Sequence, residues 1–390
     1  MKPKFLDRIR LFTVRAWLGL LNVVLVVFRK ILFPRTLLSP RNILVYKLGN
    51  IGDVVCAMPA LRAIREHFPQ SRITLLTSPG KRGAVGAKDF LDGTSYLDDI
   101  MVYYSDDIAT LKKIFSMVSK LRSKKYDTFI QLPDDWARFG TMLRNEVFAK
   151  AIGVKSATGF YLRTSALFKK AQVDFTYKDN EPTALLKILK EGGIDHSEII
   201  FEFPEYEPLS DSDRSKIEAL KRKNDIVLGV CMGGKTEDKR WPTEKFAAAL
   251  RSLKTKHTIG VLFFGGASEA DSIERVAQAS GVPYINFAGR PIKESIMAVR
   301  CADAFLTNDT GPMHIAAAFG IPIVALFSIR SVLGSWFPYG GNNICLYKKF
   351  LPCNYKDASC AKRGMAAITI EEVIGACEQM LRSIQPLYEQ

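Results

Sequence analysis

The sequence predicts an α/β protein built from two Rossmann-like halves, with an apolar and basic helix in front of them. The chain has 390 residues, which is long for one domain and favours two. From Asn42 onward, apolar strand-like runs alternate with helix-like patterns, as in parallel sheets covered by helices on both faces. The stretch 202–213, rich in proline, serine and acidic residues, interrupts this alternation and indicates a linker or domain edge.

The first half contains a series of predicted strands and helices. The strands are expected at 43–47, 73–77, 100–104 and 126–132, and the helices at 53–68, 107–122 and 138–152. The helix at 53–68 is predicted from a single apolar stripe, which consists of Val54, Ala57, Leu61, Ile64 and Phe68.

The alternation restarts after the acidic stretch. Strands are expected at 226–231, 259–264, 284–287, 303–307 and 322–327, and helices at 243–254, 269–279, 293–300 and 311–319. The sequence ITIEEVIGACEQMLRSI predicts an amphipathic terminal helix. The expected organisation is an N-terminal helical segment at 1–38, Rossmann-like domains at 41–205 and 206–368, and a C-terminal helix at 369–390.

The N-terminal segment is both apolar and basic. Within residues 1–35, eight Lys and Arg residues are opposed only by Asp7, which gives a local net charge of +7. The uncharged run 16–28 has thirteen residues, fewer than the roughly 20 that a membrane-spanning helix needs. A signal peptide is disfavoured because no small-residue cleavage site follows the run.

The spacing of polar residues in this segment predicts an amphipathic helix. Arg8, Arg15, Asn22 and Arg29 recur every seven residues and form one narrow polar stripe. In a membrane interface this stripe would face the headgroups while the apolar side chains insert, namely Trp17, Leu18, Leu21, Val24, Leu25 and Phe28. The alternative is a helix packed on the protein or in a dimer. We predict a peripheral membrane anchor.

Charge and cysteine usage limit the classes of function. The formal net charge is +15, and its part outside the N-terminal segment is spread along the chain, which suits anionic small molecules or a membrane surface. No zinc-finger, basic-zipper or RNP pattern indicates nucleic acid as a partner. The seven cysteines lack CxxC spacing, which predicts packed thiols in a reducing cytosol rather than a zinc site or a disulfide framework.

The segment NDTGPMHIAAAFGIPIVALF, residues 308–327, is a strand end followed by a helix start. Asp309 and Thr310 can cap the first helical turn, which is a purely structural interpretation. The same position, at the carboxyl end of a strand, also favours binding of an anion, and unhindered Gly311 lets it approach the backbone N–H groups. His314 lies one turn into the helix, where it either reaches a ligand or packs in the core.

Two further glycine-containing loops follow predicted strands. In CMGGKTEDKRWPTEKF, Gly233 and Gly234 allow close backbone approach, and Lys239 supplies a cation just before a helix. In GGASE, Glu269 either caps its helix or accepts hydrogen bonds from a ribose. Three such loops in one half indicate a nucleoside diphosphate site. For the loop CMGGKTEDKRWPTEKF, the alternative is a solvated charged loop without a ligand. At Gly49 the GxGxxG fingerprint is absent, which disfavours a dehydrogenase, and the chain contains no HExxH motif that would indicate a metal.

The first half carries its own loop of interest, in ILVYKLGNIGDVVCAMP. Here a strand, a glycine turn and a helix meet at Asp53, which could cap the helix, act as a base, or do both.

Taken together, four ordered segments resemble glycosyltransferase family 9, the ADP-heptose:lipopolysaccharide heptosyltransferases. They are ILVYKLGNIGDVVCAMPALRAIREHFP, KRWPTEKF, FGGASE and NDTGPMHIAAAFGIPIVALF, and the resemblance runs from Asn42 to the C-terminus. It implies the GT-B architecture, in which two Rossmann-like domains face a cleft, the first binding the acceptor and the second the nucleotide-sugar donor. It also implies inverting chemistry that needs no metal or other cofactor.

The resemblance assigns expected roles to individual residues. Asp53, which follows Gly52, matches the family's general base, and Lys239 matches the residue that meets the donor diphosphate. Glu269 corresponds to the carboxylate on the nucleoside side. The other expected donor contacts are Gly52, Gly233, Gly234, Asp309, Thr310, Gly311 and His314.

The expected reaction is transfer of a sugar, heptose from ADP-heptose, to an anionic lipid-linked glycan such as the lipopolysaccharide inner core. Lys81, Arg82 and Lys88 are candidate acceptor contacts, with a solvated loop as the alternative. Two other functions remain open: a GT-B transferase that uses another nucleotide sugar, and a non-catalytic nucleotide-sugar-binding membrane protein. The expected location is cytoplasmic, on the inner face of the cytoplasmic membrane, with residues 1–35 at its surface.

Overall fold

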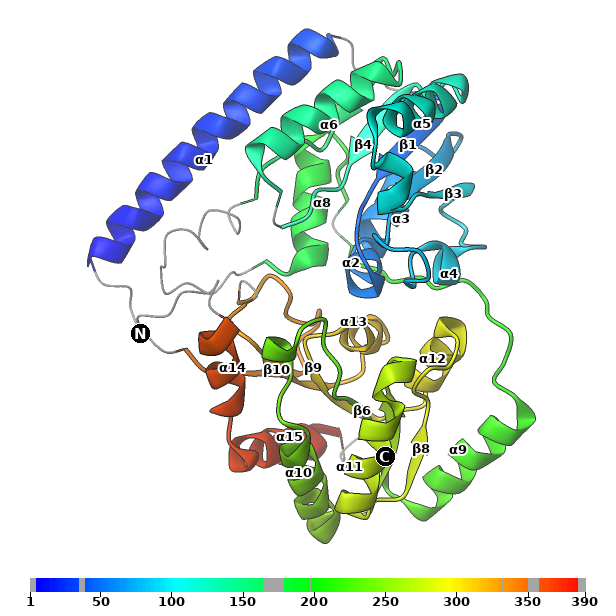
Figure 1. Cartoon of the computed structure of the whole chain (residues 1–390), viewed down its shortest axis with the longest axis vertical. Helices are drawn as coiled ribbons and strands as arrows, with labels where there is room; N and C mark the ends of the chain where they lie inside the picture. The colour runs from blue at the N-terminus through cyan, green and yellow to red at the C-terminus, as the bar shows by residue number, and fades with distance from the viewer. Residues whose placement is uncertain are drawn as a thin grey trace. The chain divides into compact units, whose positions relative to one another are not determined.

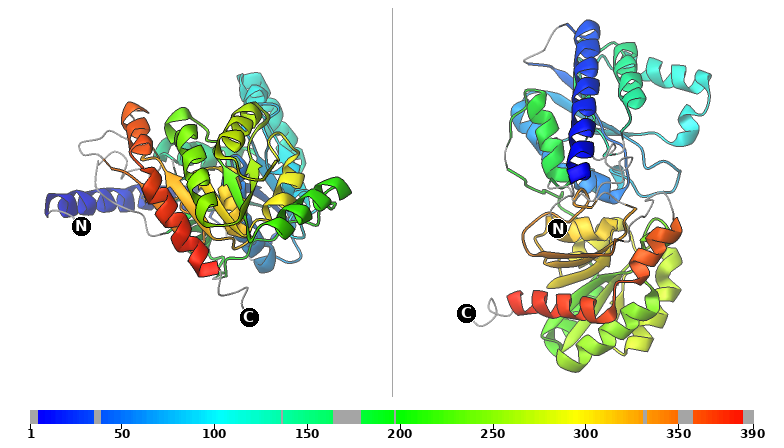
Figure 2. Two further views of the ribbon diagram at one scale, coloured as in Figure 1. Left: turned by 90° about the horizontal axis from the view of Figure 1, so that it is seen from below. Right: turned by 90° about the vertical axis from the view of Figure 1, so that its left-hand side faces the viewer.

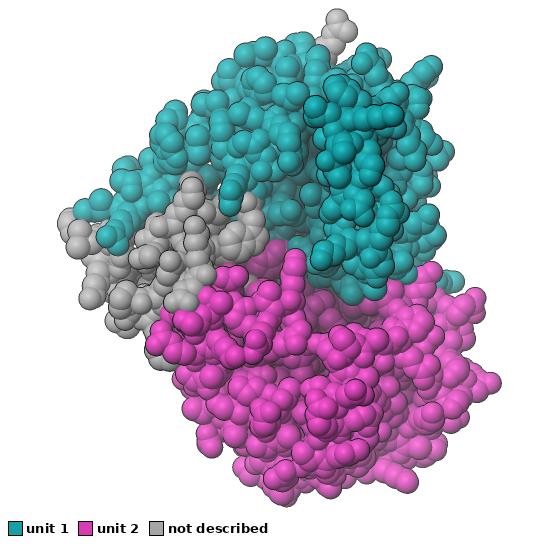
Figure 3. All heavy atoms as spheres, in the orientation of Figure 1, with its two compact units in different colours: residues 1–205 teal, residues 206–390 magenta. Residues whose placement is uncertain are grey.

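A computed structural model describes residues 5–34, 39–135, 137–163, 179–196, 198–330, 333–349 and 358–384. The chain divides into two compact units, unit 1 at Met1–Glu205 and unit 2 at Tyr206–Gln390 (Figure 3). Each unit contains one parallel β-sheet with helices packed on it (Figure 1). The predicted α/β class with two parallel-sheet halves is therefore confirmed.

The sheet of unit 1 has the strand order β3-β2-β1-β4-β5, and every neighbouring pair is parallel. The strands are β1 Asn42–Tyr46, β2 Arg72–Thr77, β3 Asp99–Val102, β4 Thr128–Gln131 and β5 Ser156–Thr158. Because β1 is central and parallel to β2 and β4, the loops that follow these three strands leave the same edge of the sheet.

The described helices of unit 1 after α1 (Phe5–Leu32) include the three that the sequence predicts, one of them divided in two, and three more, namely α4, η1 and α8. They include α2 Ile51–Val55, α3 Met58–His67, α4 Lys88–Leu91, η1 Ser105–Ile108, α5 Leu111–Ser123, α6 Phe139–Ala151 and α8 Glu181–Glu191. The expected single helix at 53–68 is two helices that meet at Ala57, because Pro59 lacks the N–H that would continue the first one. Helices α5 and α6 bury Leu121 and Met142 in one hydrophobic cluster with the sheet residues Leu44 and Phe129.

Helix α1, Phe5–Leu32, runs along the outside of unit 1 next to α6 (Figures 1 and 2). Its stretch Ile9–Leu32 is long and apolar enough to cross a membrane, although most of it is not buried in the protein. Leu18 and Leu25 are buried in the core cluster with α6. Asn22 hydrogen-bonds the backbone of Leu162 in both directions, at 3.2 and 2.7 Å.

These contacts correct the expected orientation of α1. Asn22 and Arg29, two members of the predicted polar stripe, face the protein rather than headgroups, since the Arg29 side chain donates to the Tyr161 hydroxyl. Leu18 and Leu25, which were expected to insert into a membrane, are instead part of the protein core. The heptad spacing correctly places these polar residues on one side of a helix, but it does not show which side of the helix contacts the protein.

The sheet of unit 2 has the order β11-β10-β9-β6-β7-β8, again parallel throughout. The strands are β6 Ile226–Cys231, β7 Ile259–Phe264, β8 Tyr284–Asn286, β9 Ala304–Asn308, β10 Ile323–Phe327 and β11 Asn343–Tyr347. The helices are α9 Asp211–Lys223, η2 Glu237–Lys239, α10 Thr243–Lys256, η3 Ala267–Glu269, α11 Ala270–Ser280, α12 Ile292–Val299, α13 Gly311–Ala318, α14 Ala358–Ala366 and α15 Ile370–Ile384.

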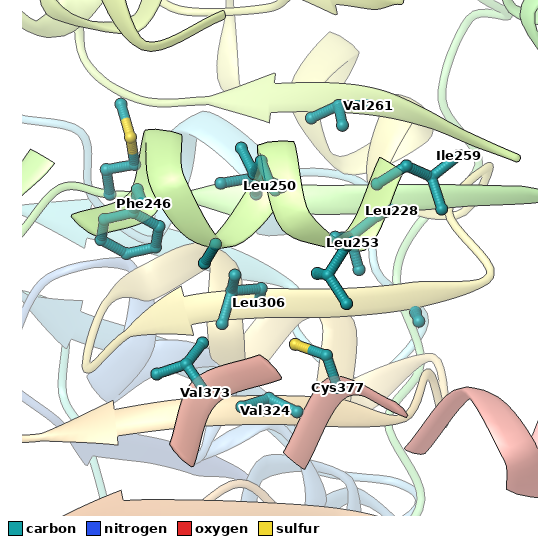
Figure 4. Close-up of a cluster of buried hydrophobic side chains, with 14 of the residues drawn as sticks. Leu228, Phe246, Leu250, Leu253, Ile259, Val261, Leu306, Val324, Val373 and Cys377 are labelled. Carbon is teal, nitrogen blue, oxygen red and sulfur yellow. The ribbon is translucent and has the colours of Figure 1, made fainter. Parts of the chain in front are cut away.

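A large hydrophobic cluster holds unit 2 together (Figure 4). Leu250 and Leu253 of α10 pack with Val373 and Cys377 of α15 against strand residues such as Leu306. On the other face of the sheet, α9 lies so close to β7 that a Cβ at Gly260 would be 2.6 Å from the Leu220 side chain. The rigid sheet between these layers fixes the positions of the loops at its carboxyl edge.

Cysteine pairing differs from the expectation of packed thiols alone. Cys56, Cys231, Cys301, Cys345 and Cys377 are free, as predicted, but Cys360 is disulfide-bonded. Spacing in the sequence does not predict this bond, because cysteine pairing depends on which residues the fold brings together.

Candidate functional site

Asp53 lies at N3 of the short helix α2, directly after the turn that follows β1. Its Oδ2 atom accepts a hydrogen bond of 2.9 Å from the backbone N–H of Asn50, which is the N-cap, so Asp53 caps the first turn from N3 and not from the N-cap position. Gly49 has φ +135°, and a Cβ at this position would lie 2.2 Å from the Cβ of Asp53. The carboxylate of Asp53 therefore folds back over Gly49 and is held against the turn.

A cluster of charged side chains, most of them buried, interacts electrostatically with this carboxylate in unit 1. Lys47, the residue after β1, is 1% exposed, and its Nζ lies 3.1 Å from Asp134 and 3.5 Å from Glu181. Glu181, in the first turn of α8, is fully buried and is also paired with Arg163. Two cations thus face the carboxylates of Asp134, Glu181 and Asp53 at the carboxyl edge of the sheet.

The cluster sets the protonation of its members. Burial raises the pKa of Asp53 to about 6, an effect that Asp134 and Glu181 increase and Lys47 opposes. Burial by itself would lower the pKa of Lys47, but Asp134, Glu181 and Asp53 together raise it, so Lys47 stays charged. A carboxyl group with a pKa near neutrality can both take up and release a proton at physiological pH.

In unit 2, Lys239 and Asp309 meet at the carboxyl edge of the sheet. Lys239 ends η2, which follows β6, and Asp309 follows the neighbouring strand β9. Their Nζ and Oδ2 atoms are 2.8 Å apart, and the Asp309 side chain is almost buried. The pair places a cation next to the N-terminus of α13, where the helix dipole also favours an anion.

The short helix η2 is attached on all three of its residues. Glu237 pairs with Lys362 of α14 at 2.6 Å, and Asp238 pairs with Arg330, after β10, at 2.9 Å. The Glu237 pair is exposed, whereas Asp238 is buried. With the Lys239–Asp309 pair, these contacts tie η2 to three different elements.

Glu269 and Gly233, the first of the two glycines after β6, border a small cavity of about 100 Å³. Its lining consists of Met232, Gly233, Arg240, Thr243, Ser268, Glu269, Ser272 and Ile273. Glu269 accepts a hydrogen bond of 2.8 Å from the backbone N–H of Gly266, which caps the short helix η3, whereas as the N-cap residue of α11 its side chain makes no capping hydrogen bond. A Cβ at Gly233 would lie 2.6 Å from a Glu269 carboxylate oxygen, which shows why this position needs glycine.

The start of α13 brings the remaining predicted donor residues together. Thr310 is the N-cap, but its hydroxyl lies 3.3 Å from Thr307 Oγ1 and makes no capping hydrogen bond, contrary to the structural interpretation. Gly311 is the first helical residue and lies at the phosphate-favouring end of the helix. His314 is buried, and its ring packs edge-on against Trp336 at 5.8 Å.

The candidate acceptor contacts lie on the surface of unit 1. Lys81 and Lys88 are exposed, and Arg82 is paired with Asp107 at 2.5 Å and lies over the Tyr104 ring. Lys81 and Arg82 lie in the loop after β2, and Lys88 begins the short helix α4.

The structure thus brings together Lys239 with Asp309, and Gly233 with Glu269. It also adds residues that the sequence did not single out, namely Lys47, Asp134, Arg163, Glu181, Asp238 and Arg330. Lys47 and Arg330 each follow a strand, and this position in the sequence could have identified them as candidate site residues. Glu181 lies 134 positions from Lys47, and no local pattern links the two. Within the described residues, no cluster of three or more His, Cys, Asp or Glu side chains is arranged to hold a metal ion.

Comparison with known proteins relates these sites to a family. The family model described as glycosyltransferase family 9 (heptosyltransferase) matches residues 114–362. One similar protein is the lipopolysaccharide core heptosyltransferase OpsX of Haemophilus influenzae, 21% identical over 364 residues, which covers 88% of this chain and 97% of that protein.

Solved structures show the same fold. A glycosyl transferase family 9 protein from Veillonella parvula has a TM-score of 0.67 at 21% identity, covering 89% of this chain and 99% of that one. The E. coli ADP-heptose lipopolysaccharide heptosyltransferase II has a TM-score of 0.59 at 18% identity, covering 88% and 99%. These similarities confirm the predicted GT-B architecture of two Rossmann-like domains.

Proposed function

Because the chain belongs to glycosyltransferase family 9 (heptosyltransferase), we propose that it transfers heptose from ADP-heptose to a lipid-linked glycan such as the lipopolysaccharide inner core. The named relatives support this choice, since one is a lipopolysaccharide core heptosyltransferase and another carries ADP-heptose in its name. The observation that carries the proposal for this chain is Asp53, a carboxylate with a pKa of about 6 at the carboxyl edge of the first sheet.

In the proposed reaction, Asp53 is the general base. A hydroxyl oxygen of the acceptor forms a bond to the anomeric carbon of the heptose while its proton moves to the Asp53 carboxylate. The bond from that carbon to the donor diphosphate breaks in the same displacement, so the configuration at the carbon inverts and ADP leaves. A base whose pKa is close to the working pH is suited to this proton transfer.

Unit 2 is proposed to hold the donor and stabilise the leaving diphosphate. Lys239 supplies a positive charge and the N-terminus of α13 supplies N–H groups, which together compensate the charge that develops on the diphosphate. Asp309, Thr310, Gly311 and His314 are proposed to contribute further contacts to the donor. Glu269 and Gly233 border the cavity proposed for the nucleoside, and Gly234 is proposed as a further donor contact. This set of groups needs no metal ion for the transfer.

The acceptor and the location complete the proposal. Lys81, Arg82 and Lys88 are proposed to contact anionic groups of a lipid-linked glycan. The enzyme would work at the cytoplasmic face of the inner membrane, with the segment 1–35 at the membrane surface.

A second candidate function is transfer from another nucleotide sugar in surface-polysaccharide synthesis, because the contacts around Glu269 do not select one nucleotide base. A non-catalytic nucleotide-sugar-binding protein is disfavoured by the position of Asp53.

The test is donor binding and turnover for wild type and Asp53→Ala, across ADP-heptose and UDP-, GDP- and dTDP-sugars. We expect both proteins to bind ADP-heptose selectively and only wild type to turn it over. Binding of a different nucleotide sugar would replace the donor assignment while keeping the mechanism. Equal turnover by Asp53→Ala would remove Asp53 as the base.

A further inference from the structure

Helix α1 has two sides, one that packs on unit 1 and one that is exposed. The inner stripe, Leu18, Asn22, Leu25 and Arg29, recurs at spacings of three and four residues and is attached to unit 1. The outer face has the same helical spacing and consists of exposed apolar side chains: Ile9, Phe12, Trp17, Leu20, Val23, Val24, Val27 and Ile31. A soluble protein rarely exposes so long an apolar face without a partner for it.

We propose that this outer face of α1 lies in the interface of an anionic lipid bilayer, with the helix parallel to the membrane plane. The geometry favours this position over a membrane span. For α1 to span, Leu18 and Leu25 would have to leave the protein core, and Asn22 would lose both of its hydrogen bonds to Leu162. In the parallel position, the inner contacts stay intact and only side chains that are already exposed enter the lipid.

Charge on α1 identifies the partner as a lipid surface. Arg10, Arg15 and Lys30 are exposed, and Arg10 and Lys30 lie at the borders of the apolar face by helical spacing. Anionic headgroups complement these cations while acyl chains accept the apolar side chains. A second copy of the chain would instead bring two sets of like charges together at the same face, which opposes self-association through α1.

The contacts of α1 with unit 1 also determine which part of the protein approaches the membrane. Lys150 of α6 donates to the carbonyl of Leu32 at 2.7 Å, so the C-terminal end of α1 is held as well as its middle. Because α1 is fixed to α6, membrane binding through its outer face gives unit 1 a defined orientation on the bilayer. A flexible tether would not do so.

The test uses the full chain and two matched double variants. Phe12→Glu/Ile31→Glu changes two side chains on α1 that are 73% and 71% exposed, and Leu111→Glu/Phe115→Glu changes two on α5 that are 74% and 71% exposed. Each adds the same negative charge at apolar sites of equal exposure. Circular dichroism first establishes that both variants are folded. Co-sedimentation is then measured with phosphatidylethanolamine–phosphatidylglycerol vesicles, without any sugar donor, so the outcome is independent of the proposed activity.

We expect the α1 variant to bind the vesicles at least about tenfold more weakly than wild type and the α5 variant to bind as wild type does. Washing with alkaline carbonate should release the wild-type protein. Equal loss in both variants would overturn the assignment to α1, and retention after the wash would show a spanning helix. A dimer in sedimentation velocity that only the α1 variant dissociates, with vesicle binding unchanged, would identify a second copy as the partner instead.

Discussion

Arg330 Nε lies 2.9 Å from Asp238 Oδ2, and this ion pair joins the segment after β10 to the short helix that carries Lys239. The Asp238 carboxylate is buried, so the pair is shielded from water on one side. Since Asp238 directly precedes Lys239, the position of the Lys239 ammonium depends on a contact made by its neighbour. Arg330 is therefore a positioning residue for the proposed diphosphate site.

Arg330→Ala should weaken donor use because Asp238 loses its partner and η2 is no longer held. We expect the KM for the donor to rise about tenfold, a loss of about 1.4 kcal/mol, with a smaller change in kcat and partial rescue by Arg330→Lys. Steady-state kinetics with varied donor checks this. Lys362→Ala, which removes the exposed pair with Glu237 on the same helix, should have almost no effect. Equal effects of the two variants would show that the Arg330 contact has no special role.

Lys239→Ala should reduce affinity for ADP because it removes the cation next to the start of α13 and leaves Asp309 without this partner. A charge-assisted contact of this kind corresponds to about 2 kcal/mol, or roughly 30-fold in the dissociation constant. Isothermal titration calorimetry with ADP measures the change. Lys235→Ala, an exposed lysine of the same loop, is the control and should bind ADP as wild type does. Unchanged binding by Lys239→Ala would separate this residue from the diphosphate.

The acid side of the pH profile should report the ionisation of Asp53. Its pKa is raised to about 6, so kcat/KM should fall about tenfold per pH unit below that value as the base becomes protonated. Two variants should move this limb in opposite directions. Lys47→Met removes a charge that lowers the pKa of Asp53 and should shift the limb to higher pH, whereas Asp134→Asn removes one that raises it and should shift the limb to lower pH. Shifts of the same sign would contradict the electrostatic origin.

Glu146 should make folding stability depend on pH. This carboxylate in α6 is fully buried, neither oxygen has a hydrogen-bond partner, and burial raises its pKa from 4.5 to about 7, against an opposing effect of Arg29. The folded state therefore holds a proton that the unfolded state releases, and stability falls as pH rises from about 4.5 to 7. Glu146→Gln should leave the free energy of unfolding little changed at pH 5 and raise it by roughly 2–3 kcal/mol at pH 8.

Urea unfolding at the two pH values tests the prediction for Glu146. Glu205→Gln is the control, because its side chain is exposed and it should change stability at neither pH. A gain for Glu146→Gln that is equal at both pH values would indicate a packing effect rather than a buried charge.

Gly49→Ala should disturb Asp53 as well as the turn. The positive φ of +135° strains any L-residue, and the added Cβ would overlap the Asp53 side chain at 2.2 Å. We expect a loss of about 1–3 kcal/mol in stability and a larger loss in kcat. Gly193→Ala provides the comparison, since it has φ +86° but open space around the Cβ. It should lose stability only. If kcat falls equally in both, the contact with Asp53 is not the cause.

The α/β class could be predicted because parallel strands buried on both faces give unbroken apolar runs, such as Ile259–Phe264, with helical patterns between them. Strand β5, Ser156–Thr158, was missed because it is short and polar, and β11, Asn343–Tyr347, because it is only partly buried at the sheet edge. The break between α2 and α3 was missed because the apolar stripe continues across Pro59 and hides the lost hydrogen bond.

The proposed site could be located from the sequence only where each residue lies in the segment that follows a strand. Asp53, Lys239 and Asp309 are of this kind. The pairing of Lys47 with Glu181 joins residues that are 134 positions apart, and that of Arg330 with Asp238 depends on how β10 and β6 are spaced in the sheet. Such partners follow from topology, which local patterns do not contain.

The two stripes of α1 have a practical consequence for anyone who prepares this enzyme. Deleting the first 35 residues to obtain a detergent-free protein would remove the side chains that cover α6, including Leu25, which is completely buried. The shortened chain would lose the exposed apolar face of α1 but would expose the apolar surface of α6 that α1 covers. Leu162 would also lose both hydrogen bonds to Asn22. Replacing only the outward residues with polar ones is the better route to a soluble form.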